Sequence, residues 1–225
     1  MTPSLDLAPI GNCSVSALID RQGRYVWACA PRVDGDPLFS ALMDGSDPDH
    51  GFWDVLLEGQ VRAEQDYVRN TPVLRTVLHD ADGASVEIID FAPRHAHQQR
   101  TYRPLAFARV IRPLSGTPRI AVRLRPAAEW GARRADKTYG SNHIRYLCSG
   151  ATFRLTTDCP VSHVLSERTF RLEKPLAFFF GPDEVYDQDV GPGLIAAHDR
   201  TVGYWQEWVR KLYLPLDWQE AVIRA

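Results

Sequence analysis

The chain has 225 residues, and its 26 lysine and arginine residues nearly balance its 28 aspartate and glutamate residues, leaving a formal net charge of -2 at pH 7. This balance gives no signal for binding a polyanion, so nucleic acid is not an expected partner. Contents of 44% hydrophobic and 24% charged residues are typical of a globular protein, and the length is sufficient for a sizeable core.

The N-terminus and the cysteines limit the kind of protein further. Residues 1–9 have no basic start and no long apolar run, so we expect neither a signal peptide nor a membrane-spanning helix. Cys13, Cys29, Cys148 and Cys159 show no C-x-x-C spacing, which argues against a structural zinc and a small disulfide framework. We therefore expect free thiols in a cytoplasmic protein, with no metal and no cofactor.

The first predicted elements are two strands and an elbow. Residues 14–19 alternate in polarity, residues 21–24 have the chemistry of a turn, and residues 25–29 form an apolar return strand. Pro31 cannot donate the next ladder hydrogen bond, which predicts that Arg32 and Asp34 are presented at the end of the strand.

Strand candidates continue along most of the chain. The clearest hairpin joins residues 71–79 to residues 84–90 through Asp82-Gly83. Further strands are expected at residues 52–58, 60–69, 105–111, 119–125, 143–148, 152–157, 161–165 and 176–180. The run 178–180 is apolar on both faces and is expected to be central to the packing of two sheets. Short strands separated by Gly and Pro predict a mainly β fold, a large antiparallel β-sandwich.

Three segments between the strands are predicted to be irregular. Residues 44–51 are expected to form a surface turn; their acids are spaced roughly as in a calcium loop, but Pro48 and the lack of a closing Glu argue against one. His95 and His97 would share a strand face, as a metal pair requires, yet no third ligand is near, so we expect a solvated loop there. Residues 132–142 are expected to form a polar, mobile loop.

In residues 119–125 the polarity alternates strictly. The expected inward side chains are Ile120, Val122 and Leu124, and the expected outward ones are Arg119, Arg123 and Arg125. The arginine row could contact sugar hydroxyls or the carboxylates of a partner, but charged side chains are the usual state of an exposed sheet face.

The pattern changes at His198, after which apolar residues recur every three and four positions and predict an amphipathic helix that Pro215 stops. Asp217 and Glu220 then have the spacing of a capping box with Asp217 as N-cap. Because a nucleated helix cannot propagate in the five residues that remain, we expect the chain to be cut from something longer.

Several of these segments resemble one family. The runs Ile10-Gly-Asn-Cys13, Gly23-Arg-Tyr-Val-Trp27, Pro31-Arg-Val-Asp34 and Phe39-Ser-Ala-Leu42 are similar to the opening of bacterial glucoamylase-like and trehalase-like enzymes of glycoside hydrolase family 15. Segments 67–71, 90–93, 126–131, 204–208 and 218–225 extend the resemblance. Asn12, Tyr25, Val26 and Val33 depart from the family pattern, whereas Arg32 and Asp34 keep it.

The resemblance implies an N-terminal β-sandwich domain at residues 1–197, a linker helix at 198–214 and the truncated start of a catalytic helical barrel at 215–225. In this family two glutamates of the barrel carry out an inverting hydrolysis of an α-glucosidic bond. Both would lie beyond Ala225, so no catalytic residue is assigned here. Four acids inside the chain are candidate substitutes, but nothing in the sequence fixes a pair of them at a reacting distance: Asp34, Asp90, Glu129 and Asp136.

The expected function is a non-catalytic domain that stabilises and shapes the barrel, with that barrel as its partner and an α-glucoside as the substrate bound through it. We place Trp27, Arg32 and Asp34 at the interface with the barrel, where the last two would bond backbone or sugar hydroxyls. The alternative for Arg32 and Asp34 is a buried clamp that holds the shape of the elbow.

Three tryptophans are predicted to pack between the domains. Helical spacing favours core or interdomain packing for Trp205 and Trp208, although a stacking platform for sugar is an alternative, and Trp218 is expected in the same interdomain contact. Two rival functions stay open: a stand-alone carbohydrate-binding module and a partner-binding sandwich unrelated to sugars.

Overall fold

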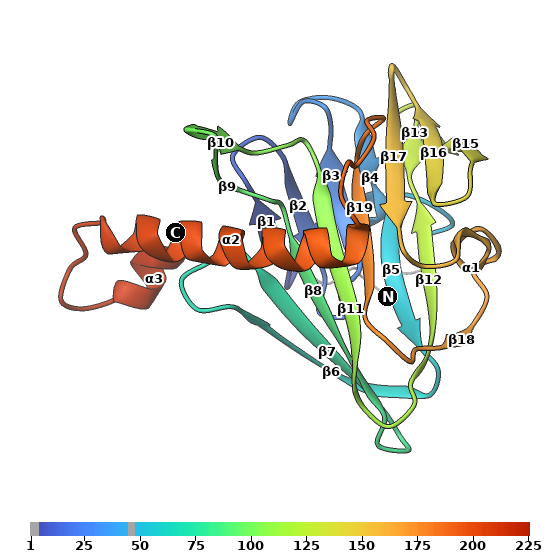
Figure 1. Ribbon diagram of the computed structural model, residues 1–225, viewed down its shortest axis with the longest axis horizontal. Helices are drawn as coiled ribbons and strands as arrows, with labels where there is room; N and C mark the ends of the chain where they lie inside the picture. Colours follow the sequence, from blue (N-terminus) through green and yellow to red (C-terminus); the bar gives the residue numbers. More distant parts are fainter. Residues whose placement is uncertain (1–4, 45–47) are drawn as a thin grey trace.

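The computed structural model describes residues 5–44 and 48–225, and over these ranges most strands join two large antiparallel sheets (Figure 1). Among the described residues, the seven-stranded sheet has the spatial order β1 (Ala8–Gly11), β2 (Ser16–Ile19), β3 (Tyr25–Cys29), β5 (Phe52–Leu57), β12 (Arg119–Arg125) and β18 (Phe170–Arg171), with β4 (Pro37–Phe39) paired to β3. The eight-stranded sheet has the order β15 (Asp136–Tyr139), β16 (His143–Cys148), β17 (Ala151–Thr157), β19 (Leu176–Pro182), β11 (Phe107–Ser115), β8 (Ser85–Phe91), β7 (Leu74–Asp80) and β6 (Gln60–Tyr67).

The smaller elements lie at the margins of these sheets. Two short hairpins pair β9 (His95–His97) with β10 (Arg100–Tyr102), and β13 (Ala127–Ala128) with β14 (Arg133–Arg134). The helical elements are the 3-10 helix η1 (Ala41–Met43), α1 (Val161–Ser166), α2 (Val190–Arg210) and α3 (Gln219–Arg224). The predicted fold, mainly β with antiparallel sheets and helices at the C-terminus, is confirmed.

The main core fills the space between the two sheets, because one side chain in two along each strand faces it. Ile120, Val122 and Leu124 on β12 are buried there, as predicted. On β19, Phe178 and Phe180 are buried in the same core, whereas Phe179 packs with a second cluster. The expectation that this apolar run packs on both faces of its sheet is therefore correct.

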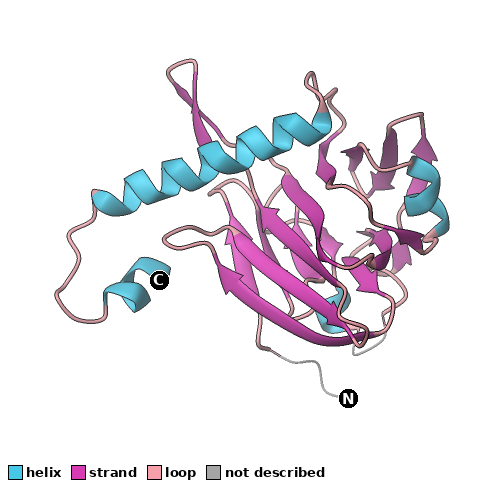
Figure 2. Cartoon of the chain, turned by 60° about the horizontal axis from the view of Figure 1, so that its bottom comes forward, coloured by secondary structure: helices cyan, strands magenta, loops and turns pink. Residues whose placement is uncertain are grey.

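Helix α2 covers the opposite face of the eight-stranded sheet (Figure 2). Leu194 and Ala197 pack there against a second apolar cluster that includes Phe91 and Val110. The helix begins at Val190, well before the predicted start at His198. The run Gly191-Pro-Gly193 looks like a helix breaker, but Pro192 lies in the first turn, where a backbone N–H has no intrahelical partner to lose.

The predicted strand at residues 161–165 is wrong, since these residues form α1. The two buried valines, Val161 and Val164, are three positions apart, which is helical spacing. His163, between them, stacks on Phe170 with the ring centroids 4.5 Å apart.

Two predicted loops contain strands instead. Within residues 132–142, β15 pairs with β16 along its whole length, although all four of its residues are exposed. Near the two histidines, β9 pairs with β10, and only His95 of this hairpin is buried. β15 and the β9–β10 hairpin are held by hydrogen bonds to their partner strands, and most of their side chains are exposed. No alternation in polarity therefore marks them as strands in the sequence. Residues 45–47 of the predicted turn at 44–51 lie outside the described residues.

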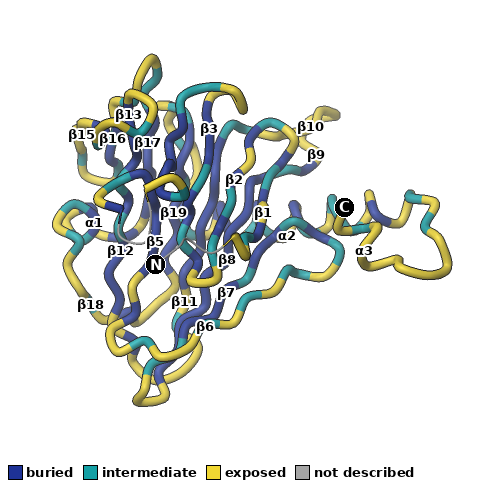
Figure 3. The backbone as a smooth tube through the Cα atoms, turned by 180° about the vertical axis from the view of Figure 1, so that it is seen from behind, coloured by how far each residue is buried: buried dark blue, intermediate teal, exposed yellow. Residues whose placement is uncertain are grey.

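The chain end also differs from its prediction. Helix α3 has Trp218 at its N-cap position, in the left-handed conformation with φ 63°, and no side chain caps it. The predicted capping box with Asp217 as N-cap is therefore wrong. Figure 3 shows that the segment joining α2 to α3 is largely exposed, in contrast to the buried centres of the sheets.

Candidate interdomain surface

The elbow after β3 presents an open ion pair. Ala30–Pro31 is a cis peptide, and beyond it the guanidinium of Arg32 donates two hydrogen bonds of 2.8 Å to the carboxylate of Asp34. Their side chains are 76% and 65% exposed, so the predicted alternative of a buried clamp is wrong. Trp27 lies on β3 opposite Leu18 and is partly buried. An exposed pair of this kind contributes little to stability and is free to meet another surface.

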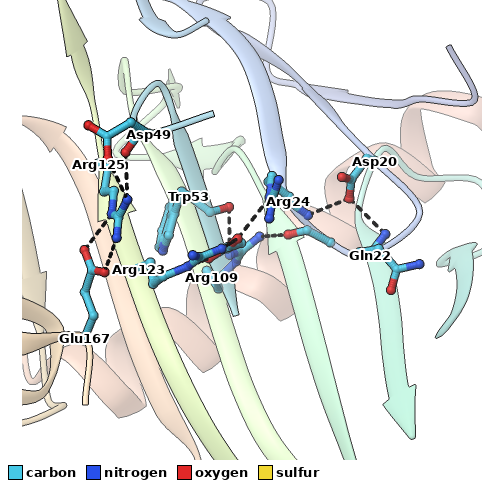
Figure 4. A network of polar contacts seen from close by, with 11 residues as sticks. Asp20, Gln22, Arg24, Asp49, Trp53, Arg109, Arg123, Arg125 and Glu167 are labelled. Atoms are coloured by element: carbon cyan, nitrogen blue, oxygen red, sulfur yellow. Dashed lines mark hydrogen bonds and ion pairs between the residues drawn. The ribbon is translucent and has the colours of Figure 1, made fainter. Parts of the chain in front are cut away.

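A buried arginine fixes the hairpin that leads to this elbow. Arg109 on β11 is fully buried, and its guanidinium donates to both carboxylate oxygens of Asp90, at 2.7 and 3.1 Å. It also donates to the carbonyl of Gly23, at 2.5 Å, and lies 4.8 Å from the ring centroid of Tyr25 and 4.7 Å from that of Trp53, beside which Figure 4 shows it. Burial raises the pKa of Asp90, and the charge of Arg109 opposes that rise. Asp90 is therefore held by Arg109 inside the core and is not accessible to substrate.

The outer face of the seven-stranded sheet carries a second network. Asp54 on β5 accepts hydrogen bonds from Arg24 and Arg123, and Figure 4 shows these two arginines together with Arg125. The guanidinium groups of all three lie over the ring of Phe52. The β12 arginines point away from the core, as predicted, but Arg123 and Arg125 are partly buried in ion pairs. They are thus committed within the domain, and do not form a solvated row.

One carboxylate anchors the end of this network. Glu167, which follows α1, receives two hydrogen bonds from Arg125 and one from Arg134. Burial alone would raise the pKa of Glu167, but hydrogen bonds and charge from Arg125 and the charge of Arg134 hold it below its ordinary value. Glu129 and Asp136, two of the four candidate acids, are both bonded to Arg133. Each of the four candidate acids is therefore bonded to an arginine.

Asn12, in the turn between β1 and β2, is a hub that the sequence did not reveal. It is fully buried, and its side-chain oxygen accepts hydrogen bonds from the backbone N–H groups of Ser14 and Val15. Its side-chain nitrogen donates to the carbonyls of Pro93, at 3.0 Å, and Pro104, at 2.7 Å. Only an amide side chain can both accept and donate in this way. The one available signal was its departure from the family pattern, which does not identify these partners.

Arg94 connects this hub to α2. Its guanidinium donates to the carbonyl of Asn12, at 2.6 Å, and lies 5.1 and 5.4 Å from the ring centroids of Tyr204 and Trp205. Trp205 is partly buried by this contact and meets Trp208 edge to face at 5.7 Å. Trp205 therefore packs within the domain, whereas Trp208, 44% exposed, lies at its margin.

The segment after α2 folds back toward β6 and β7. Arg224 lies 3.7 Å from the ring centroid of Tyr67 and donates to the carbonyl of Thr71. A cavity of about 1030 Å³ separates α3 and the end of α2 from β1 and β6. Large apolar side chains on this segment face solvent, and Tyr213, Leu216 and Trp218 are each at least 81% exposed. An exposed group of this size is typical of a surface that another protein or domain covers.

Comparison with known proteins gives one match. A family model described as "Trehalase-like, N-terminal" matches residues 4–168, a range that contains every strand from β1 to β17. Neither a curated protein nor a solved structure matches the chain. Of the helices in the described part of the chain, none combines the length and the apolar character needed to cross a membrane.

Proposed function

The chain belongs to the trehalase-like N-terminal domain family, and from this membership we propose that it is the non-catalytic N-terminal domain of an inverting α-glucosidase of glycoside hydrolase family 15. Its role is to stabilise and shape a catalytic helical barrel that follows it in the same polypeptide. An α-glucoside is then bound by the barrel, and not by an active site within this domain. The family match over residues 4–168 is the observation that carries the proposal.

The state of the acids supports a non-catalytic role. Glycoside hydrolysis needs two carboxyl groups that face one sugar, one protonated and one ionised. Here Asp90 is buried against Arg109, and Glu129 and Asp136 share Arg133. Carboxylates engaged in this way hold a fold together and are poorly placed to exchange protons with a substrate.

The distribution of exposed apolar side chains supports the proposed division of the chain. We place the sandwich domain at residues 1–197, the linker helix at 198–214 and the start of the barrel at 215–225. The first half of α2 packs on the eight-stranded sheet, whereas Trp208 and Trp218, farther along the chain, are exposed. A barrel that covers these two tryptophans would bury them as interdomain contacts.

The elbow is the second proposed contact with the barrel. Arg32 and Asp34 are exposed and held in one geometry by their paired hydrogen bonds, so they can bond backbone or sugar hydroxyls at the mouth of the barrel. In the complete enzyme, Arg32→Ala should raise KM and leave the melting temperature unchanged. A lowered melting temperature with an unchanged KM would show that the pair serves only the fold.

The proposal is tested by producing the catalytic barrel with and without the sandwich domain. We expect the barrel alone to melt at a lower temperature and to lose activity faster on heating, because the domain's contacts with it are absent. A barrel that melts at the same temperature in both forms would contradict a supporting role. The four free cysteines also favour a cytoplasmic location, which fractionation of the source cells would test.

A stand-alone carbohydrate-binding module is the alternative function. One observation favours it, namely the aromatic groove beside α2 that is described below. In that case the domain would bind glucans with the same affinity whether or not the barrel is attached, and its removal would leave the melting temperature of the barrel unchanged.

A further inference from the structure

A groove of about 580 Å³ lies beside the first half of α2, away from the proposed contacts with the barrel. One wall is the β9–β10 hairpin, the other is the segment 182–188 that joins β19 to α2, and α2 itself contributes Leu194, Ala197 and Arg200. Figure 1 shows the hairpin and this segment on the same side of α2. Its volume lies within the range of small-molecule sites, about 300–1,000 Å³.

Each wall presents an aromatic ring to the groove. On the hairpin, Tyr102 stacks on His95 with the ring centroids 5.0 Å apart and the planes 25° apart. On the opposite wall, Tyr186 packs against Phe179 at 5.0 Å. Gly193 of α2 makes room for this ring, since a Cβ there would come within 2.8 Å of the Tyr186 hydroxyl. Both rings are thus held in place by packing before any ligand binds.

Several polar groups around the groove have no partner among the described residues. The exposed side chains of Glu184, Asp187 and Arg200 line the groove, and they make neither a hydrogen bond nor an ion pair within residues 5–44 and 48–225. His95 is 5% exposed, and its Nε2 is buried without a hydrogen-bond partner in the same ranges. Unpaired polar groups that converge on a concave aromatic site are typical of a binding site.

The protonation of His95 makes it an acceptor. Its Nδ1 is 3.2 Å from the carbonyl of Ala96, a contact in which Nδ1 carries the proton and donates, so Nε2 has a free lone pair. Burial lowers the pKa of His95, which keeps the ring neutral near pH 7. The groove therefore offers acceptors on Glu184 and Asp187 and donors on Arg103, Arg200 and the tyrosine hydroxyls, whereas the Nε2 atom of His95 is buried beside it.

We propose that this groove binds a neutral saccharide. A hydroxyl group both donates and accepts, so a saccharide can use carboxylates and a guanidinium in the same site, and the apolar face of its ring packs on tyrosine. The two carboxylates of Glu184 and Asp187 balance the two guanidinium groups of Arg103 and Arg200, so the groove favours neither an anion nor a cation. Saccharide binding in this groove is a function separate from support of the barrel. Only the choice of α-glucosides as probes rests on the proposed function.

The test is calorimetric titration of the 225-residue chain with maltotriose, trehalose and cellotriose. We expect saturable heat with at least one of them, and Tyr102→Ala and Tyr186→Ala should each weaken that binding by about tenfold, since each removes a stacking surface. Tyr102→Phe should retain most of the affinity, because the ring remains. Trp130→Ala is the matched control, since Trp130 is an aromatic residue 72% exposed in another loop.

Two outcomes would overturn the site. One is the absence of saturable heat with all three saccharides, and the other is binding that Tyr102→Ala and Tyr186→Ala leave unchanged while both variants melt as the parent chain does. Neither outcome bears on support of the barrel, which is measured by the melting temperature of the barrel. Conversely, a barrel that does not need the domain would leave the groove and its ligand unaffected.

Discussion

Replacing Arg109 by Met removes the charge that compensates Asp90 in the centre of the sandwich. Both side chains are fully buried, and the guanidinium makes two hydrogen bonds to the carboxylate and one to the carbonyl of Gly23. Breaking a buried pair from one side typically costs 3–5 kcal/mol, so we expect a loss of about 4 kcal/mol in the free energy of unfolding. For a chain of this length that corresponds to a decrease of about 8–16 °C in melting temperature.

The effect of Arg109→Met should also depend on pH. Without its partner, the buried Asp90 carboxyl has a pKa raised above that of the unfolded chain, because burial disfavours the charged form. The folded state then binds an extra proton, so the variant should become less stable, relative to the parent, as the pH rises from acid toward neutral. Adding Asp90→Asn should recover part of the lost stability at pH 7, since no buried charge remains.

Denaturant unfolding at pH 7 and pH 5 measures both effects, with Arg32→Met as the matched control. Arg32 makes the same paired contact with a carboxylate as Arg109, but at an exposed site, and its loss should cost under about 1 kcal/mol. If Arg109→Met costs no more than Arg32→Met, the inference that burial gives the inner pair its importance is refuted.

Three further predictions concern the fold and its thiols. Asn12→Ala should lower the free energy of unfolding by about 2–4 kcal/mol in urea, because buried carbonyls and N–H groups lose their partners; a change below about 0.5 kcal/mol would contradict the hub. Hydrogen bonds from Arg112 and Arg75 lower the pKa of Glu87, against the effect of burial. The ionised Glu87 carboxylate therefore stabilises the fold above its ordinary pKa, and this stabilisation is lost as the pH falls through the lowered pKa. Glu87→Gln should therefore reduce the acid dependence of stability below about pH 5, and an unchanged pH profile would rule this contribution out. Under native conditions a thiol reagent should modify Cys13 first, since Cys13 is exposed whereas burial raises the pKa of Cys148 and of Cys159 to about 12; equal rates for all four thiols would disprove this.

The strands that could be predicted are those with one buried face. β12 alternates strictly in polarity, and β7 and β8 flank an Asp-Gly turn whose glycine, Gly83, has φ 88°. In each case the local pattern and the tertiary environment agree. β15 and the β9–β10 hairpin have no such pattern because their residues are mostly exposed, and only pairing with a neighbour makes them strands.

The polar networks could not be predicted, because their partners are far apart in the chain. Asp54 joins Arg24 to Arg123, and Asn12 reaches carbonyls more than 80 positions away. Arg32 and Asp34 are neighbours in the sequence, but whether they are buried depends on distant parts of the chain and could not be predicted. The groove escaped prediction because its walls come from three separate segments, and the spacing of His95 and His97 indicates only a metal pair or a solvated loop.

Glucose release from maltose and trehalose by the purified 225-residue chain tests the central claim most directly. The account predicts no release above the buffer control, because each of the four candidate acids is bonded to an arginine of the domain. Release that scales with the concentration of the chain, and that Asp34→Asn or Glu129→Gln abolishes, would contradict it.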